Sequence, residues 1–168
     1  YGAGGSTREK TREWVDRIKY EHGVETMAHL TCVGSTRESI GGILDELAAH
    51  DIDNIMALRG DPPADQPQFR ALPGGFEHAN ELVAFIRERY GDRFSLGVAG
   101  YPETHPQADS PAADLAFLAA KVRAGADFVV TQLFFDNELH LDFVARFRRA
   151  YPDLDAPINN PLAHAGLA

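Results

Sequence analysis

The sequence predicts an α/β fold of the (β/α)8 TIM-barrel type, with about half of the barrel present. Patterns typical of a strand and then a helix repeat four times along the chain after an initial helix, which indicates a parallel sheet with right-handed crossovers. Polar side chains follow the ends of four successive predicted strands, which favours a barrel over an open doubly wound sheet. A complete barrel has eight strand–helix units and ~250 residues, whereas this chain has 168. We therefore expect one partial barrel domain over residues 1–168.

The clearest predicted strand is the apolar run from Ile55 to Leu58, whose length and composition suit a strand buried on both faces. It is followed by Arg59-Gly60-Asp61 and then by a Pro/Gly-rich loop that continues to Gly75. In parallel α/β folds, ligands bind at the loops that leave the carboxyl ends of strands, and Gly60 would let a backbone approach a ligand closely. A surface turn with an exposed ion pair is the alternative interpretation of these residues.

Three further strands are expected at residues 26–32, 94–100 and 128–135. His29, the pair Tyr101 and His105, and Gln132 lie at or just after the ends of these strands. A histidine on an apolar strand is most often a core residue. Gln132 is harder to explain, because a buried amide needs partners for its donors and its acceptor, and a ligand could provide them. No clear element is expected in the tail that begins at Pro152.

Helices are expected between these strands. Ser6 to Glu9 and Ser35 to Glu38 both match the capping box that begins a helix, and Gly23 is a plausible stop for the first of these helices. Ser110 is expected to cap a helix that has Pro111 at its first position and ends at Gly125. Apolar spacing indicates two more helices, around residues 79–86 and 139–147.

Composition and charge exclude several classes of function. No apolar run approaches the ~20 residues that a membrane span needs, so we expect no membrane partner. The formal net charge of −9 argues against binding to nucleic acid or to an anionic membrane surface. The single cysteine, Cys32, fits plain core and excludes an internal disulfide. The single cysteine and the lack of a signal-peptide pattern at the start together predict a cytoplasmic protein.

Metal and phosphate sites are the alternatives that the polar residues suggest. His29, Asp61, Glu103 and His105 could supply metal ligands, but no pair with ligand spacing supports this idea, so we expect no metal. The glycine-rich residues 2–5 precede a helix and could hold a phosphate, although they lack the G-x-G-x-x-G spacing. A TIM-barrel lyase or aldolase with a phosphate or metal site is therefore an open alternative.

A set of motifs resembles the methylenetetrahydrofolate reductase family, the flavin enzymes of folate metabolism. They occur in the family's order and at its spacing from Tyr1 to about Tyr151. The motifs are Tyr1-Gly2-Ala3, His29-Leu30-Thr31-Cys32, Ala57-Leu58-Arg59-Gly60-Asp61, Tyr101-Pro102-Glu103-Thr104-His105-Pro106, Ala112-Ala113-Asp114-Leu115, and Ala124-Gly125-Ala126 leading into Thr131-Gln132-Leu133-Phe134-Phe135.

The resemblance implies a TIM barrel with FAD lying across the carboxyl ends of the strands. By motif position, the residues lining the FAD site would be Ala3, His29, Arg59, Gly60, Asp61, Ala79, Tyr101, His105, Ala108, Asp114 and Lys121. His78 joins this set at a position where the family usually has a tyrosine beside the flavin. Arg59 and Lys121 suit the anionic pyrophosphate. Asp61 and Gln132 would act in catalysis, Asp61 by tuning flavin and folate electrostatically, and Gln132 by hydrogen bonding to the pterin and the nicotinamide.

The implied reaction is the reduction of 5,10-methylenetetrahydrofolate to 5-methyltetrahydrofolate in one-carbon and methionine metabolism. NADH or NADPH would reduce FAD, and the flavin would then pass a hydride to the folate. The complete protein is expected to be a homo-oligomer.

Besides His78, two features depart from the family. The glutamate that the family uses as a general acid belongs to a strand upstream of Tyr1, and Pro157 to Pro161 differs from the family's seventh strand. We therefore expect residues 1–168 alone to be inactive. A flavin-binding piece without folate turnover is the alternative to an enzyme fragment.

Overall fold

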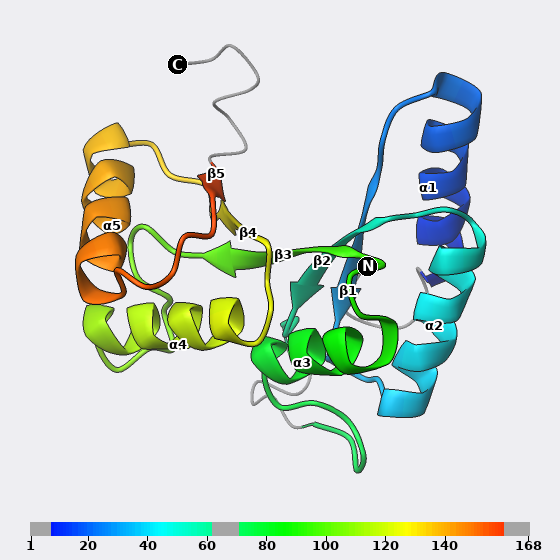
Figure 1. Cartoon of the computed structure of the whole chain (residues 1–168), viewed down its shortest axis with the longest axis horizontal. Helices are drawn as coiled ribbons and strands as arrows, with labels where there is room; N and C mark the ends of the chain where they lie inside the picture. Colours follow the sequence, from blue (N-terminus) through cyan, green and yellow to red (C-terminus); the bar gives the residue numbers. More distant parts are fainter. Residues whose placement is uncertain (1–7, 62–70, 160–168) are drawn as a thin grey trace. The chain divides into compact units, whose positions relative to one another are not determined.

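The computed structural model describes residues 8–61 and 71–159, which alternate between helices and parallel strands (Figure 1). They fall into two compact units, the first ending at Leu96 and the second beginning at Gly97. The elements are α1 (Arg8–His22), β1 (Met27–Thr31), α2 (Arg37–Ala49), β2 (Asn54–Leu58), α3 (Ala79–Tyr90), β3 (Ser95–Gly100), α4 (Pro111–Arg123), β4 (Phe128–Thr131), α5 (Asn137–Ala150) and β5 (Ile158–Asn159). This alternation confirms the predicted α/β class.

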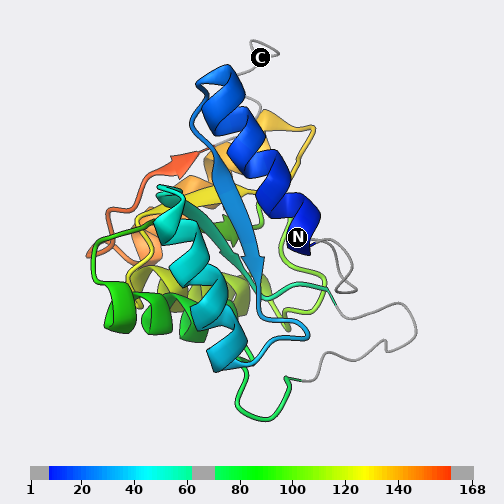
Figure 2. The same ribbon diagram turned by 90° about the vertical axis from the view of Figure 1, so that its right-hand side faces the viewer.

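In the first unit, β1 pairs in parallel with β2, from Met27 opposite Asn54 to Thr31 opposite Leu58. Residues 55–57 are buried, as predicted for a strand covered on both faces, whereas burial alternates along β1. Figure 2 shows α1 running alongside β1. Apolar side chains from α2 and α3 complete this core, among them Ile40, Leu44, Leu82 and Ile86.

In the second unit, β3 pairs in parallel with β4, and β4 pairs in parallel with β5. Val129 of β4 and Phe143 of α5 are fully buried. A Cβ atom on Gly100 would lie 2.8 Å from Val129 Cγ1 and 3.0 Å from Phe143 Cζ. Gly100 is therefore required because a helix side chain packs directly against the backbone of β3.

The structure corrects two strand predictions. β4 ends at Thr131 rather than at residue 135, so the apolar residues from Leu133 onward belong to the connection to α5. The tail is not without structure, because Ile158 and Asn159 form β5 beside β4, and Val129 donates its N–H to the Pro157 carbonyl at 2.8 Å. A strand of two residues is too short to show periodicity in a sequence.

The capping box expected from Ser35 to Glu38 is also shifted. Thr36 is the N-cap of α2, and the Thr36 and Ser39 side chains accept hydrogen bonds from each other's backbone N–H groups at 3.2 and 2.9 Å. Ser35 is buried and its hydroxyl donates to the Val33 carbonyl. The first capping box, Ser6 to Glu9, begins outside the described residues, whereas α1 ends before Gly23 as predicted.

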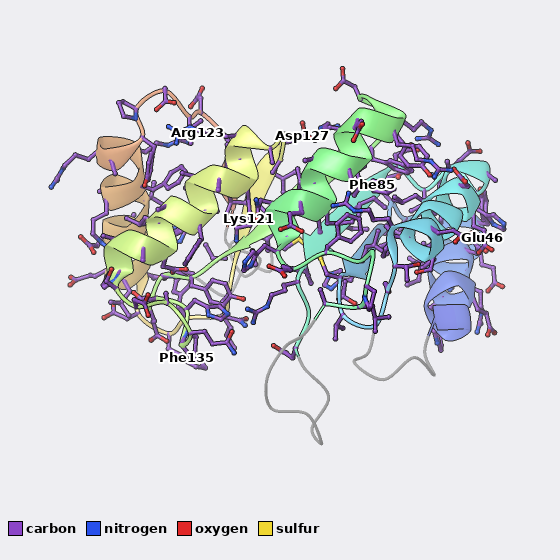
Figure 3. All side chains as sticks on the ribbon, turned by 90° about the horizontal axis from the view of Figure 1, so that it is seen from below. Glu46, Phe85, Lys121, Arg123, Asp127 and Phe135 are labelled. Carbon is purple, nitrogen blue, oxygen red and sulfur yellow. The ribbon has the colours of Figure 1, made fainter. Side chains whose placement is uncertain are left out.

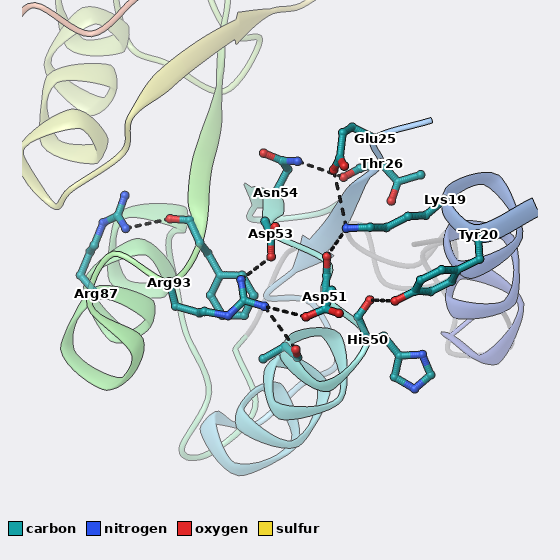
Figure 4. A network of polar contacts seen from close by, with 12 residues as sticks. Lys19, Tyr20, Glu25, Thr26, His50, Asp51, Asp53, Asn54, Arg87 and Arg93 are labelled. Carbon is teal, nitrogen blue, oxygen red and sulfur yellow. Dashed lines mark hydrogen bonds and ion pairs between the residues drawn. The ribbon is translucent and has the colours of Figure 1, made fainter. Parts of the chain in front are cut away.

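A network of polar contacts joins the segments that precede the first three strands (Figure 4). The Arg93 guanidinium pairs with the Asp53 carboxylate and donates to the Ala48 carbonyl at 3.2 Å. Asn54 donates to the Thr26 carbonyl at 3.3 Å, and Ser95 donates its N–H to the Asp53 carbonyl at 2.8 Å. These contacts lie at the amino ends of the strands, which in a barrel contribute to stability rather than to binding.

We expect Arg93→Ala to lower the free energy of unfolding by about 1–3 kcal/mol, because it removes a charge-assisted hydrogen bond and leaves Asp53 without its cation. Chemical denaturation measures this effect. The control is Arg89→Ala, which removes an exposed pair with Asp45 at 2.8 Å and should cost less than about 1 kcal/mol. Equal losses in the two variants would contradict a special role for Arg93.

Candidate functional site

The loop after β2 begins with a tightly packed turn. Gly60 has a φ of +84°, and a Cβ atom there would lie 2.8 Å from Val33 Cγ1 and 3.0 Å from Thr31 Cβ. Val33 donates its N–H to the Arg59 carbonyl at 3.1 Å, which ties this loop to the loop after β1. Within the described structure, the need for glycine at position 60 is thus explained by its backbone conformation and by its neighbours in the protein. Arg59 is half-buried, and Asp61 is exposed.

We expect Gly60→Ala to destabilise the protein by roughly 1–3 kcal/mol, because the new methyl group meets Val33 in a backbone conformation that already disfavours alanine. Gly74→Ala is the matched control. Gly74 has a φ of +75°, but a methyl group added there would meet no atom within 4 Å, so this variant carries the conformational cost alone. Thermal unfolding of both variants separates the two contributions, and a smaller loss at Gly60 than at Gly74 would refute the packing argument.

The other predicted residues of the first unit lie on β1, where His29 is the central residue rather than at the end as expected, and at the start of α3. His29 is exposed on β1, so its interpretation as a core residue is wrong, and partial burial still lowers its pKa. His78 is the N-cap of α3 without a capping side-chain bond, and Ala79 is the first residue of that helix. Cys32 is buried as expected, and burial raises the pKa of its thiol to about 12, which makes it a poor nucleophile.

In the second unit, the loop after β3 folds onto α4. The Tyr101 and His105 rings meet edge to face, with centroids 4.6 Å apart. His105 donates its N–H to Asp114 Oδ2 at 3.1 Å, and Ala108 donates its N–H to the His105 carbonyl at 2.9 Å. The structure thus brings together four of the predicted residues, Tyr101, His105, Ala108 and Asp114, through direct contacts.

Lys121 lies two turns after Asp114 on α4 (Figure 3). Its ammonium group donates to the Ala99 carbonyl of β3. Burial lowers the pKa of the Lys121 amine to about 8, and the nearby Asp114 carboxylate partly opposes this shift. The result is a partly dehydrated cation near the carboxyl half of β3, which an anionic ligand group would stabilise.

Gln132 follows the last residue of β4. It donates its N–H to the Gly100 carbonyl at 2.8 Å, and its own Oε1 accepts a hydrogen bond from the Leu133 N–H at 3.0 Å. Its side chain is exposed, so the prediction of a buried amide is wrong. The bond from Leu133 fixes the orientation of the carboxamide, whose NH2 group is the part of the side chain that can donate to a ligand.

Ala3 lies outside the described residues. The other predicted residues divide between the first unit, which holds those up to Ala79, and the second unit, which holds Tyr101, His105, Ala108, Asp114, Lys121 and Gln132. Among residues 8–61 and 71–159, no group of three or more His, Cys, Asp or Glu side chains is arranged to hold a metal ion. No helix in that part of the chain is long and apolar enough to cross a membrane.

Sequence reasoning misses one pair near Gln132. The Phe134 and His140 rings stack with centroids 5.0 Å apart and planes inclined by 9°. The sequence predicts that Phe134 belongs to a strand over residues 128–135. Because β4 ends at Thr131, Phe134 instead lies in the connection to α5, where it meets His140. The remaining signal in the sequence is the aromatic residue two positions after Gln132.

Parallel strands that alternate with helices place the chain in the class of α/β proteins, which includes the TIM barrels and the open doubly wound sheets. Within that class, residues 1–159 match the family model described as methylenetetrahydrofolate reductase. The chain belongs to the methylenetetrahydrofolate reductase family, whose fold is a TIM barrel, and its elements are those of part of such a barrel.

Three relatives illustrate the match. The chain is 48% identical over 153 residues to methylenetetrahydrofolate reductase (NADH) 1 of Arabidopsis thaliana, covering 86% of this chain and 26% of that protein. It is 47% identical over 127 residues to a probable methylenetetrahydrofolate reductase (NADPH) of Caenorhabditis elegans, covering 73% and 18%. It is 41% identical over 143 residues to 5,10-methylenetetrahydrofolate reductase of Pectobacterium carotovorum, covering 85% and 45%. The chain therefore spans about a quarter of the length of its plant relatives.

Proposed function

We propose that this chain supplies FAD-binding and folate-binding residues to an oxidoreductase that converts 5,10-methylenetetrahydrofolate into 5-methyltetrahydrofolate with NADH or NADPH. Family membership supports the reaction, and the names of the relatives include both nicotinamide donors. The observation that carries the proposal is the cluster in the second unit, where His105 contacts Asp114 and a partly dehydrated Lys121 lies on the same helix.

The residues present fit an anionic cofactor. The Lys121 ammonium has the Ala99 carbonyl as its hydrogen-bond partner, and a pyrophosphate oxygen would compensate the cost of its burial. Arg59 would add a second cation, and Tyr101 presents a ring for packing. FAD, when bound, would accept a hydride from the nicotinamide and deliver it to the methylene carbon of the folate.

Gln132 and Asp61 would act on the substrates. The Leu133 N–H holds the Gln132 oxygen, which orients the carboxamide, and Gln132 would offer its NH2 group to acceptor atoms of the pterin or of the nicotinamide amide. The exposed Asp61 carboxylate would oppose negative charge on the flavin and favour positive charge on the folate. We also propose a cytoplasmic, homo-oligomeric protein that uses no metal.

The test uses the full-length protein. It should be yellow as purified, and heat or acid should release FAD. NADH or NADPH should bleach the flavin without oxygen, and methylenetetrahydrofolate should then restore its colour and yield 5-methyltetrahydrofolate. A colourless protein that reduces the folate would contradict the cofactor assignment, and a flavin that is bleached but not restored would indicate a flavoprotein without folate turnover.

We expect Arg59→Ala and Asp61→Asn to separate binding from chemistry. Arg59→Ala should weaken FAD retention, because a hydrogen bond to a charged group is worth about 1.5–3 kcal/mol. Asp61→Asn should retain FAD but slow flavin reoxidation by the folate more than flavin reduction by the nicotinamide. Stopped-flow measurement of both half-reactions tests this, with Arg89→Ala as the control. Equal slowing of both half-reactions would argue against an electrostatic role for Asp61.

A further inference from the structure

The segment that carries Gln132, residues 132–136, has little side-chain packing of its own. Leu133 is 49% exposed and Phe135 is 94% exposed, and Figure 3 shows Phe135 at the edge of the second unit. Phe134 is only 4% exposed. Phe134 is therefore the side chain that anchors this segment to the rest of the unit.

Phe134 is held by a residue from the next helix. The His140 imidazole, in the second turn of α5, stacks on the Phe134 ring with centroids 5.0 Å apart and planes only 9° from parallel. The Asp136 side chain caps α5 by accepting from the Glu138 N–H at 2.9 Å. The cap fixes where α5 begins, and this places the His140 ring beside Phe134.

His140 contacts Phe134 by stacking its ring, not by a hydrogen bond. Its Nδ1 atom is buried and has no hydrogen-bond partner in the part of the chain that the structure describes. Burial also lowers the pKa of His140, which favours the neutral imidazole, and a neutral ring stacks on an apolar face at a smaller desolvation cost. A carbon ring of similar shape should therefore serve equally well.

We propose that His140 is a positioning residue that holds Gln132 in its binding orientation by stacking on Phe134. Gln132 is tied to the Gly100 carbonyl by its backbone and to Leu133 by its side chain, so it depends on the conformation of residues 132–136. Loss of the stack leaves that segment in its binding conformation for a smaller fraction of the time. This inference rests on the proposed function, because it assumes that Gln132 contacts the folate.

The expected effect is on binding rather than on the chemical step. The free energy of an aromatic pair corresponds to about a 2- to 10-fold change in population. His140→Ala should raise the KM for methylenetetrahydrofolate by about that factor, because apparent affinity falls with the fraction of the competent conformation. The kcat at saturating folate and the FAD content should stay close to those of the unsubstituted protein.

The test compares three variants of the full-length protein. His140→Phe keeps a flat ring and should restore the KM, whereas His140→Ala should not. Leu141→Ala is the matched control, because Leu141 is the next residue of α5, is 66% exposed and makes no ring contact with Phe134. Hydrogen exchange read by mass spectrometry should show faster exchange over residues 132–136 in His140→Ala only.

Three outcomes would overturn the proposal. They are a His140→Phe variant as impaired as His140→Ala, a Leu141→Ala variant with the same KM as His140→Ala, and unchanged exchange over residues 132–136 in His140→Ala. Absence of folate turnover in the unsubstituted protein would instead refute the proposed function. The exchange comparison would still decide whether His140 orders the segment.

Discussion

Lys121→Met should make the FAD-free protein more stable and at the same time weaken its hold on FAD. The buried amine has a pKa of about 8, compared with an ordinary value of 10.5, so folding at neutral pH opposes the charge on Lys121. That shift corresponds to roughly 3 kcal/mol at most, and the lost hydrogen bond to Ala99 offsets about 1 kcal/mol of it. Thermal unfolding of the protein stripped of flavin measures the gain.

The pH dependence of stability gives the sign of this effect independently. Because the folded state releases the Lys121 proton at a lower pH than the unfolded chain, the unfolded state holds more protons between pH 8 and 10.5. The contribution of Lys121 to stability is therefore unfavourable below pH 8 and is relieved as the pH rises toward 10.5. Lys121→Met should remove this rise from the stability profile.

Lys19→Met is the matched control for Lys121→Met. Lys19 lies 3.7 Å from the Glu25 carboxylate and donates to the Asp51 carbonyl, so its removal should destabilise the protein and leave FAD retention unchanged. A loss of stability in Lys121→Met as large as that in Lys19→Met would contradict the interpretation of Lys121 as a dehydrated cation. Unchanged FAD affinity would contradict its proposed role toward the pyrophosphate.

Asp114→Ala should have the second large effect. It should lower the affinity for FAD, because it removes a contact that holds the loop after β3. The Asp114 carboxylate accepts from the His105 N–H and opposes the pKa shift of Lys121. Without it, the His105 N–H loses a charged acceptor, which is worth about 1.5–3 kcal/mol. The pKa of Lys121 should also fall further, so that its charge is lost at a lower pH. Fluorescence titration with FAD across a range of pH measures both effects.

Asp114→Asn separates the two contributions, because an amide oxygen can still accept from His105 but carries no charge. It should keep the conformation of the loop and shift the pH at which FAD affinity declines to lower values. If the two variants at position 114 behave alike at every pH, the lost charge alone accounts for the effect and the hydrogen bond to His105 contributes nothing. If Asp114→Asn keeps the pH dependence of the unsubstituted protein, the electrostatic link to Lys121 is wrong.

The elements with strong local signals could be predicted from the sequence. The apolar run at Ile55 and the glycine after α1 are such signals, and the structure confirms both. The choice between Ser35 and Thr36 as the cap depended on which hydroxyl the tertiary fold buries, and β5 depended on pairing with β4. Neither depends on local sequence alone.

The residues of the candidate site could be predicted from the sequence, but the contacts and burial of their side chains could not. The family motifs identified Lys121 and Gln132, yet periodicity could not show that Lys121 turns to the Ala99 carbonyl or that Gln132 is exposed. These properties depend on where β4 stops and on how α4 packs against β3. The stack of His140 on Phe134 depends in the same way on where β4 ends and α5 begins, and its one signal in the sequence is the aromatic residue two positions after Gln132.

The most direct test of the proposed function is an anaerobic two-step reaction of the full-length protein, followed by flavin absorbance and product analysis. We expect NADH or NADPH to bleach a bound FAD, and methylenetetrahydrofolate to restore its colour with one equivalent of 5-methyltetrahydrofolate formed per flavin. Gln132→Ala should retain FAD and slow both steps. A protein that forms the product without a bound flavin, or a Gln132→Ala variant with both steps unchanged, would contradict the proposed function and the role of Gln132 in it.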